Sequence, residues 1–173
     1  AIDGVLLLNK PRGISSQQAV SRVRFLYSAA TAGHTGTLDP MADGLLPMCF
    51  GEATKYTHML LDADKAYRAR IRLGVVTSTG DAEGEVLHTA KPITNPALVN
   101  SVLERFSGEL LQKPPMYSAI HHQGVRLYEY ARQGIEIERD LRRVFIHDLT
   151  LLAVGADTLD IDVRCSKGTY IRT

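Results

Sequence analysis

The sequence predicts an α+β fold in which helices flank a mixed, largely antiparallel sheet. Two observations lead to this prediction. Strand patterns follow one another directly at residues 144–152 and 158–165, and Gly155 between them indicates a hairpin or meander. Helical patterns occur as separate segments, such as the one bracketed by Pro96 and Gly108, so the chain lacks the regular strand–helix alternation of a βαβ fold.

The N-terminal part of the chain predicts strand, helix and strand in that order. Residues 4–11 form an apolar run that ends at a proline, which is typical of a short buried strand. A helix follows, capped by Ser15 or Ser16 and ending near residue 30, because apolar residues recur at helical spacing within it. Residues 45–50 predict a second apolar strand.

Next come a predicted helix at 52–61 and the clearest strand pattern of the chain, at 65–73. Side chains in a strand alternate between its two faces. One predicted face is apolar and consists of Tyr67, Ala69, Ile71 and Leu73. The other face is basic and consists of Arg68, Arg70 and Arg72.

The remaining segments are shorter. A polar turn at 77–84 precedes a strand at 85–88. Two prolines lead into an extended segment at 114–120, and a short helix at 125–133 is closed by Gly134, a residue typical of helix C-termini. Strand-like residues then continue from the last hairpin to the end of the chain.

The composition predicts one sizeable core. The chain has 173 residues, 45% of them hydrophobic and 23% charged, which favours one domain, or one with a small appendage. The formal net charge is only +1, so nucleic-acid binding requires local basic clusters. Cys49 and Cys165 show neither metal spacing nor a disulfide framework. The sequence lacks a signal pattern and an apolar run of membrane-spanning length, so a cytoplasmic protein is expected.

A stretch dense in Gly, Thr, Asp and Pro spans residues 33–47 and predicts a loop between ordered elements. Asp39 precedes Pro40, which favours an extended backbone at Asp39. Loops held by a rigid scaffold often carry catalytic groups, and Asp39 is the carboxylate of this loop that we consider for that role. The alternative is that the Asp39 side chain only caps its own turn.

Asp39 is the candidate nucleophile or base. A carboxylate acts covalently when it is ionised, oriented and shielded from water, and a cation beside it favours that state. Arg172 is the candidate cation, although it is equally well read as a solvated charge at a strand end. The histidines show no metal-ligand spacing, and the chain has neither a triphosphate-binding loop nor a Gly-x-Ser-x-Gly motif.

Three further residues are candidates for substrate binding. Tyr67 lies on an apolar strand face and is either a core residue or a ring that stacks on a base. Tyr170, in a basic stretch that contains glycine, fits stacking better. His34 either bonds to the loop backbone or occupies the space of an unpaired base.

Basic residues interleaved with aromatics fit an RNA surface better than a protein partner requires, although solvated strand and helix faces are the default interpretation. These basic residues are Lys10, Arg12, Arg22, Arg24, Arg68, Arg70, Arg72, Arg142, Arg143 and Lys167.

Several strings in order resemble the TruB family of pseudouridine synthases. Residues 33–40 match its catalytic-loop signature Gly-His-x-Gly-x-Leu-Asp-Pro at every fixed position. Residues 4–13 resemble its N-terminal Lys-Pro motif, and 65–67 the segment with its active-site tyrosine. Residues 115–119 match another recurrent string, and 165–172 the motif that supplies a tyrosine and an arginine.

The resemblance implies the pseudouridine synthase fold and the isomerisation of uridine 55 in the T loop of tRNA, without metal or organic cofactor. It makes Asp39 the catalytic aspartate and Arg172 its partner, with Tyr67 and Tyr170 at the target base and His34 in the space of the flipped base. The partner is then the tRNA T stem-loop, with no membrane, and a monomer is expected. Residues 1–173 are expected to be a catalytic domain truncated at its C-terminus, without the PUA domain of the family.

Two other classes of function stay open from the sequence. One is a tRNA-binding or folding-chaperone module in which the loop around Asp39 is only structural. The other is a small hydrolase that uses Asp39 and His34 as an acid–base pair, although it lacks an identifiable third residue and gives no reason for the arginines of the 65–73 strand.

Overall fold

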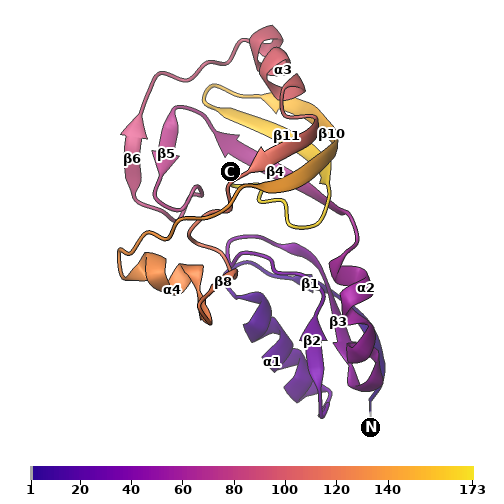
Figure 1. The fold of residues 1–173 in the computed structure, drawn as a ribbon. Coiled ribbons are helices and arrows are strands. Elements are labelled where there is room, and N and C mark those ends of the chain that lie inside the picture. Colours follow the sequence, from indigo (N-terminus) through magenta and orange to yellow (C-terminus); the bar gives the residue numbers. More distant parts are fainter. Residues whose placement is uncertain (1) are drawn as a thin grey trace. The chain divides into compact units, whose positions relative to one another are not determined.

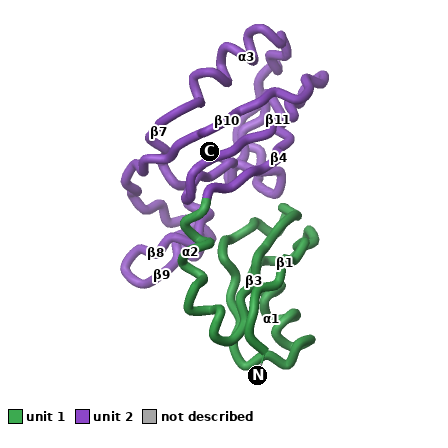
Figure 2. The backbone as a smooth tube through the Cα atoms, turned by 90° about the vertical axis from the view of Figure 1, so that its right-hand side faces the viewer, with its two compact units in different colours: residues 1–63 green, residues 64–173 purple. Residues whose placement is uncertain are grey.

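The computed structural model describes residues 2–173, which fall into two compact units (Figures 1 and 2). Unit 1 ends at Ala63 and is green in Figure 2, whereas unit 2 begins at Asp64 and is purple. The boundary between them falls between helix α2 (Thr57–Leu61) and strand β4 (Lys65–Arg72).

Unit 1 contains a three-stranded antiparallel sheet in the order β1-β3-β2. Its elements before α2 are β1 (Gly4–Lys10), α1 (Ser16–Leu26), β2 (Ala32–His34), β3 (Gly44–Phe50) and the 3₁₀-helix η1 (Gly51–Tyr56). The two predicted strands are confirmed, and they pair along their whole length, from Gly4 opposite Phe50 to Lys10 opposite Gly44.

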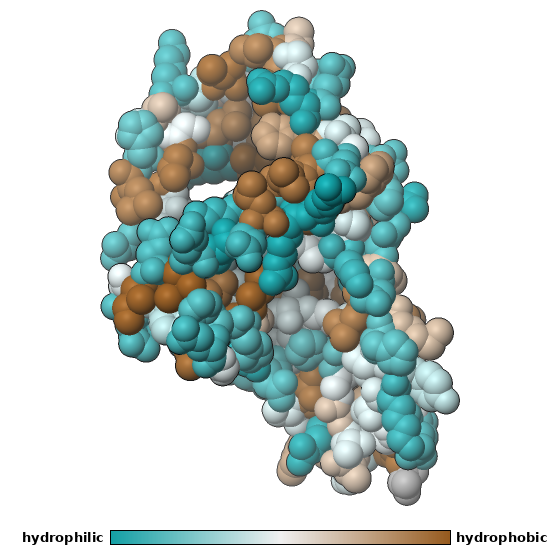
Figure 3. Space-filling model, in the orientation of Figure 1, coloured by the Kyte–Doolittle hydropathy of each residue, from teal (hydrophilic) through white to brown (hydrophobic). Residues whose placement is uncertain are grey.

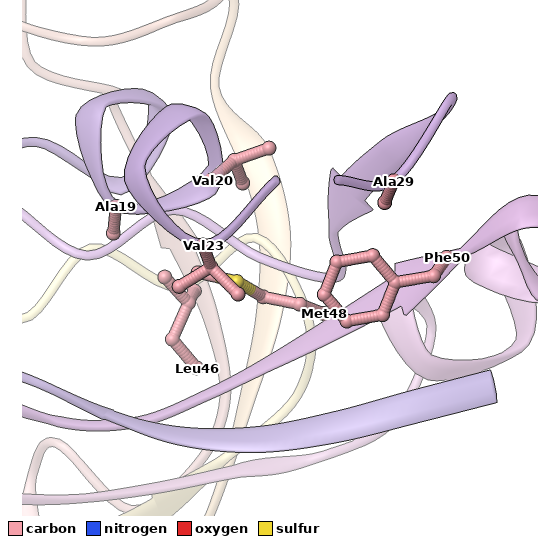
Figure 4. Packing of buried hydrophobic residues seen from close by; sticks show 7 residues of the cluster. All are labelled: Ala19, Val20, Val23, Ala29, Leu46, Met48 and Phe50. Atoms are coloured by element: carbon pink, nitrogen blue, oxygen red, sulfur yellow. The ribbon is translucent and has the colours of Figure 1, made fainter. Parts of the chain in front are cut away.

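The core of unit 1 lies between α1 and β3 (Figure 4). Apolar side chains at helical spacing on α1 pack onto alternate side chains of β3. The buried set consists of Ala19, Val20, Val23, Ala29, Leu46, Met48 and Phe50. This packing holds the segment between β2 and β3 at one edge of a rigid layer.

Helix α1 begins with a capping box. The Ser15 hydroxyl accepts a hydrogen bond from the Gln18 N–H (3.1 Å), and the Gln18 side chain accepts one from the Ser15 N–H (2.8 Å). Ser15 is therefore the cap, and Ser16 is inside the helix. The predicted end near residue 30 is wrong, because Ser28 has a φ of +49°, which a continuing helix does not allow.

The predicted helix at 52–61 is divided into η1 and α2. The Thr54 hydroxyl donates to the Gly51 carbonyl (2.7 Å), and the Thr57 hydroxyl donates to the Thr54 carbonyl (2.7 Å). These bonds compete with the backbone pattern of a regular α-helix, so threonine side chains explain why apolar spacing alone was misleading here.

Unit 2 is built on a four-stranded antiparallel sheet in the order β4-β11-β10-β7. After β4 its elements are β5 (Val75–Thr77), β6 (Val86–Thr89), α3 (Pro96–Glu104), β7 (Gly108–Gln112), β8 (His121–His122), β9 (Val125–Arg126), α4 (Leu127–Arg132), β10 (Arg142–Val154) and β11 (Thr158–Cys165). Strands β5-β6 and β8-β9 form separate two-stranded sheets. The α+β class with antiparallel pairing and flanking helices is confirmed.

The hairpin β10–β11 and the two faces of β4 agree with the sequence. Buried β11 side chains alternate with polar ones, and Val163 lies opposite Tyr67 of β4. The arginine face of β4 is exposed. One end of the predicted 125–133 helix instead forms β9, and strands β5 and β7 were not predicted, because segments of three and five residues show too little periodicity.

The segment after β11 is not a strand, which corrects the expectation of strand structure up to the last residue. Gly168 has a φ of +76°, the Thr169 hydroxyl donates to the Ser166 carbonyl (2.9 Å), and the Thr173 N–H donates to the Tyr170 carbonyl (3.3 Å). The chain therefore turns twice after Cys165. Figure 3 shows that unit 2 also exposes hydrophobic side chains over α3 and just after it, where Leu98, Val102 and Phe106 are 42–51% exposed.

Candidate active site

Asp39 lies between β2 and β3 in unit 1, in a loop as predicted. The predicted loop was too long at both ends, since His34 is the last residue of β2 and β3 begins at Gly44. His34 is paired with Met48 in the sheet register. Two strands of one sheet therefore fix the start and the end of the segment that carries Asp39.

The backbone on both sides of Asp39 is held by the segment that begins α1. The buried Ser16 hydroxyl donates to the Leu38 carbonyl (3.1 Å) and accepts from the Leu38 N–H (2.9 Å). The Gly13 N–H donates to the Pro40 carbonyl (2.8 Å). With both neighbours fixed, the direction in which the Asp39 side chain leaves the backbone is restricted, as a catalytic carboxylate requires.

Lys10, at the end of β1, is fully buried beside this loop. Its ammonium group donates to the carbonyls of Pro11 (2.9 Å) and Ile14 (2.8 Å). Burial lowers the pKa of Lys10, and the nearby carboxylates of Asp43 and Asp39 oppose this shift. Lys10 therefore ties down the chain just before α1 and contributes positive charge near Asp39.

His34 is half-buried, and burial lowers its pKa, an effect that the backbone of Gly36 partly offsets. Its Nδ1 atom is buried and has no hydrogen-bond partner among residues 2–173. A lowered pKa favours the neutral ring at pH 7.

Three of the predicted site residues belong to unit 2. Tyr67 on β4 is half-buried and packs against the cluster of Ile146, Val163 and Cys165, and Ile171 packs against the same cluster. The structure thus brings the Tyr67 ring and the segment that contains Tyr170 and Arg172 to one small core. Tyr67 is partly a core residue, as the first of its two interpretations required.

The Arg172 side chain is only 14% exposed, so it is not a solvated charge at a strand end. Its guanidinium donates to the carbonyls of Thr79 (3.1 Å) and Tyr117 (2.9 Å). Asp81 Oδ2 lies 3.7 Å from Arg172 Nη1. Gly80 makes this approach possible, because a Cβ atom there would lie 2.9 Å from the Arg172 carbonyl oxygen.

Sequence reasoning missed Ser16 and Asp81, which support the predicted site residues. The signal for Ser16 was present, because only one of two adjacent serines can cap α1 and the other is left for a different partner. Asp81 gave no such signal. The residues that flank Asp81 are typical of an ordinary turn. Its partner Arg172 is distant in the sequence, so the pairing could not be predicted from local patterns.

The arginines of β4 face a row of aspartates on β11 and in the turn just before it. Arg68 binds Asp162 through two hydrogen bonds (2.8 and 2.9 Å), and Arg70 binds Asp160 in the same way (2.6 and 2.7 Å). These bonds lower the pKa of both aspartates. Arg72 pairs with Asp157 (3.5 Å). The charges of the predicted basic face of β4 are therefore neutralised by aspartates, which weakens the interpretation of this face as an RNA surface.

Within residues 2–173, no group of three or more His, Cys, Asp and Glu side chains is arranged to hold a metal ion. No helix in this part of the chain is long and apolar enough to span a membrane.

The chain is similar to known proteins along its whole length. The family described as "TruB family pseudouridylate synthase (N terminal domain)" matches residues 24–171. The tRNA pseudouridine synthase B of Marinomonas sp. (strain MWYL1) is 59% identical over 100% of this chain and 56% of that protein. That of Chromohalobacter salexigens is 58% identical over 99% of this chain and 56% of that protein. The chain thus spans little more than half the length of these relatives.

Solved structures share the fold. A chain in the crystal structure of a Cbf5-Nop10-Gar1 complex superposes with a TM-score of 0.73 and is 28% identical, over 97% of this chain and 41% of that one. A chain in the structure of an H/ACA RNP bound to a substrate RNA containing 2'-deoxyuridine gives a TM-score of 0.68 at 25% identity, over 97% and 39% of the two chains. With its catalytic-loop signature on an ordered loop and a family match over most of its residues, this chain belongs to the TruB family of pseudouridylate synthases.

Proposed function

We propose that the protein containing this chain converts a uridine in the T loop of tRNA, uridine 55, to pseudouridine. The observation that supports this most directly is the fixed loop around Asp39, in which Leu38 is hydrogen-bonded to Ser16 of α1 and Pro40 to Gly13 just before α1. Family membership and the names of the two relatives agree with it. The proposal includes tRNA as partner, a monomeric state and a cytoplasmic location.

The reaction moves the uracil on its ribose. The bond from the sugar C1′ to N1 of the base breaks, a bond from C1′ to C5 forms, C5 loses its proton and N1 gains one. Atoms and electrons balance without an oxidant or a reductant. The base must leave its stack to turn over, and an unpaired loop makes this step less costly than a duplex does.

We assign Asp39 to the start of glycosidic bond cleavage, by attack on the sugar or base or by proton abstraction. Arg172 is the proposed partner that keeps Asp39 ionised and oriented. Tyr67 is proposed to stack on the target base or to transfer a proton to it, and Tyr170 to stack beside it. His34, with its neutral ring favoured at pH 7, is proposed to fill the space that the flipped base leaves.

The experiment is tritium release from a T-arm RNA labelled at C5 of uridine, catalysed by the complete protein and by its Asp39→Asn variant. We expect release by the wild type and none by the variant. Asp43→Asn is the matched control, because Asp43 is in the same loop but its side chain is 57% exposed and pairs with Arg12. Asp43→Asn should keep the wild-type rate.

Two results would contradict the proposal. Full turnover by Asp39→Asn would remove Asp39 from the chemistry. Absence of release from every protein, with tight binding of the T-arm RNA retained, would favour an RNA-binding module without catalysis.

A further inference from the structure

Gln112 is the last residue of β7, and its side chain forms two hydrogen bonds with the backbone of a single residue. Its Nε2 donates to the Tyr170 carbonyl (2.9 Å), and its Oε1 accepts from the Tyr170 N–H (2.8 Å). A side-chain amide has one donor side and one acceptor side, as a peptide group does. Gln112 therefore binds Tyr170 as a neighbouring strand would.

This pairing replaces a missing strand interaction. The pairing of β11 with β10 extends one residue past Cys165, where the Ser166 N–H donates to the Phe145 carbonyl (2.8 Å) and the Ser166 hydroxyl accepts from the Phe145 N–H (2.9 Å). Tyr170 lies beyond the end of this pairing. A half-buried peptide group needs hydrogen-bond partners, and Gln112 supplies both for Tyr170. Gln112 is itself fixed, because β7 pairs with β10 and Gln112 lies opposite Arg142.

The segment that Gln112 holds carries two of the proposed site residues. Tyr170 is bound directly, and Arg172 follows two residues later. The Arg172 side chain also binds the carbonyls of Thr79 and Tyr117 and pairs with Asp81. Gln112 thus fixes the backbone segment that carries both the Tyr170 ring and the Arg172 guanidinium.

We infer that Gln112 is a positioning residue for pseudouridine formation, which sets the backbone of Tyr170 and through it the directions of the Tyr170 and Arg172 side chains. This inference rests on the proposed function. Gln112 acts through these residues and not on the RNA, so its loss lowers turnover more than RNA binding. Misplacement of a reacting group by about 1 Å costs on the order of a hundredfold in rate.

Three substitutions in the complete protein test this role. Gln112→Met keeps the length of the side chain and removes both hydrogen bonds. Gln112→Glu keeps the acceptor for the Tyr170 N–H but, when ionised, places a carboxylate against the Tyr170 carbonyl. Gln112→Asn keeps the amide on a shorter side chain. The control is Gln133→Glu, because Gln133 is exposed at the end of α4.

The measurements are single-turnover rate, KM and Kd for a T-arm RNA, and the midpoint of thermal unfolding. We expect Gln112→Met to lower the rate by about 10- to 100-fold, with KM and Kd within about twofold of the wild type. Gln112→Asn should recover part of the rate, and Gln133→Glu should match the wild type.

The pH dependence gives a second readout. Below the pKa of the introduced carboxyl group, Gln112→Glu carries an O–H that donates to the Tyr170 carbonyl, so the rate of the variant relative to wild type should rise as the pH falls. If Gln112 contributed only to stability, its substitution would not lower the single-turnover rate of the folded protein while KM stays near the wild-type value.

The outcomes distinguish this inference from the proposed function. If the wild type releases no tritium from the labelled RNA, both the proposed function and the inference fail. If the wild type is active and Gln112→Met turns over at the wild-type rate, only the inference fails. The inference also fails if two results are found together. In the first, Gln112→Met unfolds at a lower temperature but its folded fraction keeps the wild-type rate. In the second, the rate of Gln112→Glu relative to wild type does not change with pH.

Discussion

Asp81 and Arg172 form an ion pair that is largely withdrawn from solvent. Their side chains are 10% and 14% exposed, and Asp81 Oδ2 lies 3.7 Å from Arg172 Nη1. The other carboxylate oxygen, Oδ1, accepts from the Thr79 hydroxyl (2.6 Å) and the Glu83 N–H (3.0 Å). The loop between β5 and β6 thus orients a carboxylate whose charge stabilises the guanidinium of Arg172, the proposed partner of Asp39.

Replacing Asp81 by Asn should reduce both stability and turnover. The substitution leaves the Arg172 charge buried without its carboxylate, and breaking a buried pair in this way typically costs about 3 kcal/mol or more. We expect about 2–3 kcal/mol in urea unfolding, since Arg172 keeps its bonds to the Thr79 and Tyr117 carbonyls. Turnover of T-arm RNA should fall at least about tenfold, because Arg172 loses one of the groups that hold its direction.

Asp157→Asn is the matched control for Asp81→Asn. Asp157 pairs with Arg72 at 3.5 Å, but both side chains are exposed, and exposed pairs contribute little. Equal losses in the two variants would show that the burial of the Asp81 pair has no special effect.

Ser16→Ala should loosen the loop that carries Asp39. The substitution removes a donor and an acceptor for Leu38 in a buried position, which costs about 1–3 kcal/mol. Turnover should fall while the affinity for RNA stays near the wild-type value, and chemical unfolding with single-turnover kinetics measures both effects. Ser21→Ala is the control, since the exposed Ser21 hydroxyl only donates to the Gln17 carbonyl within α1. A Ser16→Ala protein as active as Ser21→Ala would contradict the proposed role.

The lowered pKa of His34 predicts a pH-dependent stability. The unfolded chain takes up a proton on His34 at about pH 6.5, whereas the folded protein does so only at lower pH. Stability from this residue is therefore full above about pH 6.5 and declines as the pH falls through the interval down to the folded pKa. Urea unfolding at pH 7.5 and 5.5 should show a smaller difference for His34→Gln than for the wild type.

The exposed His88 on β6 provides the comparison for His34. His88→Gln should keep the wild-type difference between the two pH values. If His34→Gln retains it as well, His34 is not the residue that senses the change.

Arg70→Gln should leave the salt dependence of RNA binding unchanged. Its guanidinium is already bound to both oxygens of Asp160, so little of its charge is available to a phosphate. A residue that does neutralise a phosphate of single-stranded RNA contributes about 0.7 to the slope of log K against log salt. Titrations of T-arm RNA at several salt concentrations measure the slope, and a decrease of that size for Arg70→Gln would restore the RNA-surface interpretation.

Local patterns predicted most of the regular elements and the loop position of Asp39. Periodicity predicted the β10–β11 hairpin and the two faces of β4, and the signature string predicted the loop of Asp39. The supporting bonds could not be predicted, because their partners are distant in sequence. Ser16 and Leu38 are 22 residues apart, Gln112 and Tyr170 are 58 apart, and Arg172 and Thr79 are 93 apart. Such pairs depend on how strands are brought together, which periodicity does not specify.

The errors have physical causes of the same kind. The helix predicted at 52–61 is divided into a 3₁₀-helix and a short α-helix, because threonine hydroxyls bind the backbone there. The last segment was predicted as a strand from its composition, whereas its hydrogen bonds come from a glutamine side chain and from its own turns.

The hydrogen bonds that hold the Asp39 loop are made by main-chain atoms of Leu38 and Pro40. Mutational tolerance should follow from this. The exposed Thr37 can vary widely without moving Asp39, whereas Ser16 and Gly13, outside the signature string, should be almost as intolerant as the string itself. In a saturation library selected for function, the replacements accepted at Gly13 would be few, because its φ of +85° disfavours any side chain.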